Sequence, residues 1–130
     1  NSTVISLDLS RRGWSGTIPD ELILLDGLLT LDLSFNNFGG TMPSTFGQLN
    51  NLVHLDLSAN RLTGTIPSTL PKAFEMYLGQ NDWSSSVLPE EVCKRKENGI
   101  LGNIVVGEDC SCCSYCPSNV VGAGLKALLP

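Results

Sequence analysis

The tetrapeptide Leu-Asp-Leu-Ser recurs three times in this 130-residue chain, beginning at Leu7, Leu31 and Leu55 with a constant interval (31 − 7 = 24 and 55 − 31 = 24). A constant interval of this size indicates a solenoid, in which each repeat is one supersecondary unit stacked on the next. Within each unit, Leu-x-Leu predicts a short strand whose leucines face the interior while the aspartate between them faces outward. Strands of successive units then form a parallel sheet.

Other positions recur in the same register, and each has a physical role. A glycine predicts a turn with positive φ, and an Ile-Pro or Met-Pro pair predicts the end of a strand. An asparagine after the strand predicts a buried ladder of side-chain hydrogen bonds to the backbone of the neighbouring coil. An apolar residue two positions after the asparagine position predicts core packing. The recurring residues are Gly16, Gly40 and Gly64; Pro19, Pro43 and Pro67; Asn36 and Asn60; and the apolar Trp14, Phe38, Leu62 and Trp83.

Two departures from the repeat matter. Arg12 stands where the first copy would have its asparagine, so we expect the ladder to be interrupted there. A fourth, degraded copy runs from Leu78 to Pro89 and has Ser84, Ser85 and Ser86 in place of the glycine, which predicts an irregular outer turn.

With these residues in hand, the stretch from Val4 to Pro89 resembles leucine-rich repeats of the plant-type class, L-x-x-L-x-L-x-x-N-x-L-x-G-x-I-P. The resemblance implies an α/β solenoid with a short parallel β-sheet on its concave face and a convex side of 3-10 and irregular segments. We assign about four repeats to residues 1–92, a cysteine-rich C-terminal cap to 93–116 and an extended tail to 117–130.

All five cysteines follow the repeats, which indicates a disulfide-stapled cap in an oxidising compartment. The candidates are Cys93, Cys110, Cys112, Cys113 and Cys116. An odd number leaves one thiol unpaired, modified or intermolecular; a metal site and a redox-active pair are the alternatives for the cluster. The cluster resembles the cap of secreted or surface leucine-rich repeat proteins of diatoms and related algae. That resemblance implies an extracellular or cell-surface location, with the thylakoid lumen as the alternative.

Composition and charge exclude some classes of binding partner. The net charge of −5 argues against nucleic acid, because a phosphate backbone needs clustered cations. The one basic run, residues 94–96, lies beside glutamates, and we expect it in a solvated loop. No apolar run is long enough to cross a membrane. Asn1-Ser2-Thr3 makes Asn1 a glycosylation candidate. Because nothing before Val4 could cap the solenoid, we expect a missing cap or a neighbouring chain at that end.

The outward strand positions supply the candidate partner-binding residues. They are Asp8, Arg11, Thr30, Asp32, Phe35, His54, Asp56, Tyr77 and Gln80. We expect the stacked aspartates to accept hydrogen bonds from neighbouring hydroxyls; a column of carboxylates that attracts a cation or a basic peptide is the alternative. We expect Phe35 to be an exposed contact anchor.

Catalysis is not indicated by these residues. A glycosidase-like carboxylate pair would need an asymmetry that separates the two pKa values, and the repeat supplies none. A triad of Ser58, Asp56 and His54 fails because Asp56 lies between the other two on one strand and no oxyanion donor is apparent. We therefore predict a non-enzymatic recognition module without cofactor or metal, which binds protein or carbohydrate through its concave face. The alternative is a structural or scaffolding subunit of a larger assembly.

Overall fold

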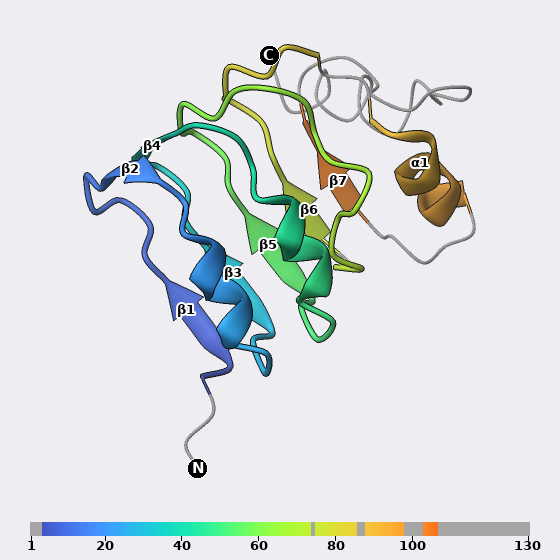
Figure 1. Cartoon of the computed structure of the whole chain (residues 1–130), viewed down its shortest axis with the longest axis horizontal. Helices are drawn as coiled ribbons and strands as arrows, with labels where there is room; N and C mark the ends of the chain where they lie inside the picture. The colour runs from blue at the N-terminus through green and yellow to red at the C-terminus, as the bar shows by residue number, and fades with distance from the viewer. Residues whose placement is uncertain (1–3, 74, 86–87, 98–102, 107–130) are drawn as a thin grey trace, which may run out of the picture.

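The computed structural model of the chain describes residues 4–73, 75–85, 88–97 and 103–106. Five short strands lie side by side in chain order (Figure 1). They form one parallel sheet in the order β1-β3-β5-β6-β7 and comprise β1 (Ser6–Asp8), β3 (Thr30–Asp32), β5 (His54–Asp56), β6 (Glu75–Tyr77) and β7 (Asn103–Val105). Each strand belongs to one coil, so the predicted solenoid with a parallel sheet is confirmed.

The leucines of the repeat build the core, as the alternation of strand side chains requires. Leu7 pairs with Leu31 and Leu31 with Leu55 in the register of the sheet. Leu31, Leu33, Leu55 and Leu57 are at most 1% exposed, whereas Leu7 is only partly buried. Interior coils therefore enclose their leucines more completely than the first described coil does.

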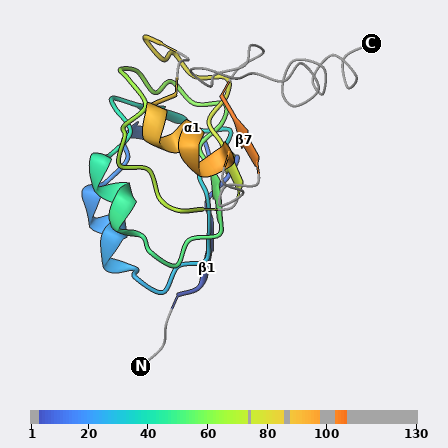
Figure 2. The ribbon, with the colours of Figure 1, turned by 90° about the vertical axis from the view of Figure 1, so that its right-hand side faces the viewer.

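Opposite the sheet lie two 3-10 helices, η1 (Asp20–Leu24) and η2 (Ser44–Gln48) (Figure 2). Each follows the proline of an Ile-Pro or Met-Pro pair, and both prolines have extended backbone. Proline fixes φ and lacks an N–H, so it ends the preceding extended segment and precedes a helical turn without losing a bond. The predicted convex side of 3-10 and irregular segments is confirmed.

A second sheet joins the two faces of the solenoid. It contains β2 (Ser15–Thr17) and β4 (Asn37–Gly39), paired in parallel, and an isolated bridge joins Thr41 to Thr63. The repeated glycines of this region have positive φ, between 72° and 90°: Gly16 lies within β2, Gly40 directly follows β4, and Gly64 follows the bridge residue Thr63. The sequence correctly predicts these turns, but it does not predict that the segments beside them pair as a sheet.

The predicted asparagine ladder is confirmed and extends into the fourth coil. The Asn60 amide nitrogen donates to the carbonyl oxygen of Leu33 in the preceding coil at 2.9 Å. Asn36 and Asn81 donate in the same way to the carbonyls of Leu9 and Leu57, at 2.8 and 3.0 Å. Every rung thus reaches back to the coil before it. The first described coil has no such coil before it among the described residues, so an asparagine at position 12 would find no acceptor there.

The expectation that Trp14 packs in the core is wrong. At the same position of later coils, Phe38 is 5% exposed, Leu62 is fully buried and Trp83 packs partly buried against the core. Trp14 is 47% exposed. A side chain at this position is covered by coils on both sides of it, and Trp14 has a described coil on one side alone.

The C-terminal part differs from expectation in two respects. The basic run at 94–96 lies in helix α1 (Glu90–Glu97) and not in a loop, and Lys94 forms an i,i+4 ion pair with Glu90 at 3.3 Å. The helix forms because Val92 and Cys93 bury one of its faces, at 0% and 2% exposure. Strand β7 also adds a fifth coil inside the segment assigned to the cap.

The fourth coil keeps its strand but loses its outer sheet. In the described residues 75–85 no strand continues the second sheet; the Ser84 N–H donates to the Gly64 carbonyl at 2.9 Å instead. The outer turn predicted to be irregular runs on to Ser86, which lies outside the described residues. The candidates Asn1, Cys110, Cys112, Cys113 and Cys116 and the tail 117–130 lie outside the described residues. No helix among the residues described has the length and apolar character needed to cross a bilayer.

Candidate functional site

The outward side chains of the five-stranded sheet form one surface, here called the sheet face. Strand register places them in columns that run across the coils. One column contains Ser6, Thr30, His54 and Glu75, and the next contains Asp8, Asp32, Asp56 and Tyr77. The sequence-predicted residues of these columns therefore lie together on one surface. Adjacent members of a column are about 4.8 Å apart, the spacing of neighbouring strands.

Each aspartate of the second column is held by the serine two residues later. The serine N–H and hydroxyl both donate to the aspartate Oδ1, with Oγ–Oδ1 distances of 2.6 Å at Asp8, 2.6 Å at Asp32 and 2.5 Å at Asp56. The expected hydroxyl donation to the aspartates is confirmed. Among the described residues none of the three carboxylates forms a salt bridge, so the second oxygen of each faces outward without an internal cation.

The pKa of Asp8 lies below its ordinary value of 3.8. The Ser10 hydroxyl is the largest cause and the Ser10 N–H the next, because both donate to the charged form. Desolvation acts in the opposite direction, and the positive charge of Arg12 lowers the pKa slightly further. The Asp8 carboxyl is thus ionised at neutral pH.

The column that follows the strands has an unexpected backbone. Arg11, Phe35, Ala59 and Gln80 all have φ between 55° and 57°. Residues other than glycine seldom adopt this left-handed backbone conformation. Here it turns the N–H groups of Arg11, Phe35 and Ala59 toward carbonyls of the next coil, at 3.0 Å each. No signal in these residue types could have indicated the conformation, because none of them is a residue that favours positive φ.

The left-handed backbone lifts Phe35 out of the core, and its side chain is 45% exposed. The guanidinium carbon of Arg11 lies 3.9 Å from the centre of the Phe35 ring. A cation over an aromatic face is attracted by the negative charge of the ring surface. The expectation that Phe35 is an exposed aromatic on this face is therefore confirmed, and Arg11 covers one side of it.

His54 contacts two residues of the neighbouring strand β6. Its Nδ1 lies 3.8 Å from Glu75 Oε2, and its ring centre lies 5.5 Å from that of Tyr77. The Tyr77 hydroxyl donates to the same Glu75 oxygen at 2.8 Å. Glu75 is a sheet-face residue that sequence reasoning missed. Its position in the fourth copy, level with His54, is the signal that could have found it.

A shallow depression of about 230 Å³ opens on the sheet face. Its lining comes from three adjacent coils and consists of Phe35, Asp56, Ser58, Tyr77, Gly79 and Gln80. Four of these residues were predicted from the sequence; Ser58 and Gly79 were assigned to the adjoining column without a binding role. Of the predicted set, Asp8, Arg11, Thr30, Asp32 and His54 lie on the same face outside this depression.

An apolar column borders the sheet face at the start of the strands. Ile5, Leu29 and Val53 directly precede three paired strands, and they are 55%, 40% and 50% exposed. The sequence analysis did not single them out. Three exposed aliphatic side chains therefore stand in register beside the polar columns.

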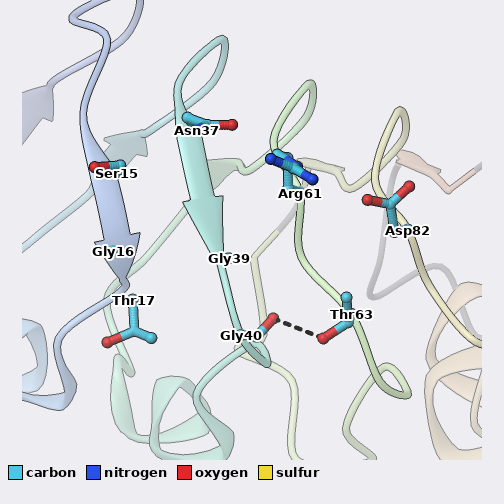
Figure 3. Close-up of a pocket in the computed structure, with 9 residues that line it drawn as sticks. All are labelled: Ser15, Gly16, Thr17, Asn37, Gly39, Gly40, Arg61, Thr63 and Asp82. Carbon is cyan, nitrogen blue, oxygen red and sulfur yellow. Dashed lines mark hydrogen bonds between the residues drawn. The ribbon is translucent and has the colours of Figure 1, made fainter.

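A second depression, of about 450 Å³, lies on the side of the solenoid along the second sheet (Figure 3). Its floor contains Gly16, Gly39 and Gly40, and Arg61 projects between Asn37 and Asp82. The Thr63 hydroxyl donates to the Gly40 carbonyl at 3.3 Å within it. This polar surface was missed from the sequence, because its residues come together only through pairing of the second sheet. In the part of the chain that the structure describes, no group of three or more His, Cys, Asp or Glu could hold a metal ion.

Comparison with known proteins defines the architecture. Residues 26–82 match the family described as leucine rich repeat. The fold is a leucine-rich repeat solenoid. Among curated proteins, no significant match to the sequence was found.

Several solved plant leucine-rich repeat structures resemble this chain. The Arabidopsis receptor kinase HAESA, in complex with the peptide hormone IDA and the co-receptor SERK1, is 33% identical with a TM-score of 0.71 over 83% of this chain and 18% of its own. The plant peptide hormone receptor RGFR1, in complex with RGF2, is 30% identical with a TM-score of 0.70 over 79% and 16%. The BIR3–SERK2 complex from Arabidopsis thaliana gives 34% identity and a TM-score of 0.61 over 85% and 61%. The chain thus spans less than a fifth of the first two and about three fifths of the third.

Proposed function

We propose that this leucine-rich repeat solenoid is a non-catalytic recognition module that binds an extended polypeptide segment of a partner through its sheet face. The observation that carries the proposal is the open sheet face itself. Exposed Phe35 lies on it beside the column of aspartates, and the apolar column of Ile5, Leu29 and Val53 borders it. Among the described residues no element packs over these columns.

The likeness to receptor ectodomains supports the proposal. The HAESA and RGFR1 structures are complexes with peptide hormones, and the BIR3–SERK2 structure is a complex of two proteins. An extended peptide suits a surface of parallel columns, because its alternate side chains can meet successive columns. The same likeness supports an extracellular location for this chain.

The geometry of the sheet face also favours binding over catalysis. Asp56 and Ser58 are bonded to each other, and the nearest carboxylate to His54 is Glu75 at 3.8 Å. His54 contacts Glu75 and Tyr77, and neither is the serine or cysteine of a nucleophile–histidine pair. A polar surface without an activated group can recognise a partner but supplies no reaction centre.

The test is a displayed library of random 12-residue peptides selected on the full chain. Selected peptides should bind the wild-type chain and lose at least about tenfold in affinity for the double variant Phe35→Ala, His54→Ala, since one exposed anchor is worth more than about 1 kcal/mol. The matched control is Leu24→Ala, Gln48→Ala, which changes two exposed side chains on the 3-10 helices opposite the sheet. A selection that yields no binder, or whose binders respond to the control and not to the sheet-face variant, would contradict the proposal.

A further inference from the structure

We infer that the depression between Phe35 and Gln80 is a pocket for a cationic side chain, with arginine preferred, of the bound polypeptide. The inference rests on the proposed function, because it names the side-chain class that the sheet face selects. Three independent observations converge on it: the space, the free aromatic face and the sign of the surrounding charge.

The space exists because two small residues interrupt columns of larger ones. Ala59 lies between Phe35 and Gln80 in the column of residues with left-handed backbone that follows the strands, and its methyl group is too small to fill the gap between them. Gly79 takes the place that serine occupies in the three preceding coils and contributes no side chain. The resulting volume of about 230 Å³ lies below the range of pockets for drug-sized ligands, about 300–1,000 Å³, and matches a single long side chain.

The aromatic wall of the pocket is the side of Phe35 away from Arg11. Arg11 belongs to the coil before Phe35, whereas the remaining pocket residues belong to the two coils after it. The Phe35 ring already holds one guanidinium, 3.9 Å from its centre. A second guanidinium entering the pocket meets the same attraction from the opposite side. Phe35 and Gln80 are two strand spacings apart, about 10 Å, which leaves room for one flat group between them.

The charge at the base of the pocket selects a cation. Asp56 lines it, and the Asp56 Oδ1 is occupied by the N–H and hydroxyl of Ser58 at 2.9 and 2.5 Å. Its Oδ2 has no partner among the described residues. Glu75, held by the Tyr77 hydroxyl, adds a second carboxylate on the adjacent strand.

The basic side chains of the sheet face already have partners. Arg11 stacks on Phe35, and His54 faces Glu75. A carboxylate ligand would therefore meet net repulsion, and an apolar side chain would desolvate Asp56 without compensation. Arginine is preferred to lysine because its planar guanidinium can stack on the ring and bond a carboxylate at once.

The test is a titration of the isotopically labelled full chain, followed by amide chemical shifts. The probes are the acetylated amides of arginine, lysine, leucine and glutamate. We expect acetyl-arginine amide to shift the amides of Phe35, Asp56, Gly79 and Gln80 with a Kd in the millimolar range, about −4 kcal/mol. Acetyl-lysine amide should shift the same amides with a weaker Kd, and the other two should leave them unmoved.

Two charge-matched variants make the test specific. Asp56→Asn keeps an oxygen for the Ser58 donors and removes the charge, so it should weaken arginine-amide binding at least fivefold. Asp26→Asn changes an exposed acid away from the sheet face by the same charge and should leave the Kd unchanged. Equal weakening in the two variants would show unspecific attraction to an acidic protein and would overturn the pocket, as would shifts that lie outside it.

The outcome separates this inference from the proposed function. Selected peptides that depend on the sheet face but tolerate replacement of every arginine and lysine would overturn the cationic pocket and leave polypeptide binding intact. Selected peptides that ignore the sheet face, together with arginine-amide shifts confined to the pocket, would overturn the proposed function and leave the pocket's cation preference intact.

Discussion

Replacing Asn60 with alanine tests the side-chain ladder that joins the coils. Asn60 is 8% exposed. Its amide nitrogen donates to the carbonyls of Leu33, Leu57 and Ser58 at 2.9, 3.1 and 3.2 Å, and its Oδ1 accepts from the Phe38 N–H at 3.1 Å. One side chain thus satisfies backbone groups from two coils, so its removal affects both coils at once.

The loss of stability in Asn60→Ala depends on which backbone groups keep another hydrogen-bond partner. The Leu33 carbonyl still accepts from Asn36 at 3.0 Å, and the Leu57 carbonyl still accepts from Asn81 at 3.0 Å. The Phe38 N–H has Asn60 as its hydrogen-bond partner and would be left buried without an acceptor. An orphaned buried donor costs about 1–3 kcal/mol, and the lost donations of the two Asn60 amide hydrogens, which the three carbonyls share, cost about 1 kcal/mol each. We expect Asn60→Ala to lower the free energy of unfolding by about 3–5 kcal/mol.

The assay is equilibrium unfolding in urea, in which a slope of about 2 kcal/mol/M would place the midpoint about 1.5–2.5 M lower. Asn51→Ala is the matched control, because Asn51 is exposed and makes one bond, to the Asp26 carbonyl at 2.9 Å. We expect it to cost less than about 1 kcal/mol. The reasoning is refuted if the two variants are equally stable, or if Asn60→Ala costs less than about 1 kcal/mol.

Two further substitutions test a close backbone approach and a hydrogen-bonded carboxylate. Gly47→Ala would bring its Cβ into hard contact with the carbonyl oxygen of Thr69 in the next coil, so we expect the free energy of unfolding in urea to fall by at least about 1–3 kcal/mol. The control Gly39→Ala has open space around its Cβ and should change that free energy by less than about 0.5 kcal/mol. Ser10→Ala should raise the pKa of Asp8 toward 3.8, because it removes the largest cause that lowers it. Since the folded pKa is depressed, the stabilisation linked to Asp8 is present above about pH 4 and is lost as the pH falls through the folded pKa. Carboxyl NMR titration measures this change, and an unaltered Asp8 pKa in the variant would contradict the assigned cause.

The repeat predicted most of the fold and the placement of most sheet-face residues. A fixed interval sets the strand register, so residues such as Asp32 and Asp56 must lie in one column once the coils stack. Sequence reasoning was weaker where the pattern fades. Strand β7 and helix α1 carry no Leu-Asp-Leu-Ser pattern; β7 lies within the segment assigned to the cap, and α1 spans the boundary placed between residues 92 and 93.

The sequence by itself determined the solenoid, its parallel sheet and its asparagine ladder, because these depend on local periodicity repeated in register. The tertiary structure alone decided how much each repeated position is covered: Trp14 is exposed where Phe38 is buried, since burial depends on the presence of coils on both sides. It also decided the left-handed backbone at Phe35 and Ala59, which the bonds between coils impose against residue preference. The gap between Phe35 and Gln80 arises only when three coils are stacked, and no single repeat contains it.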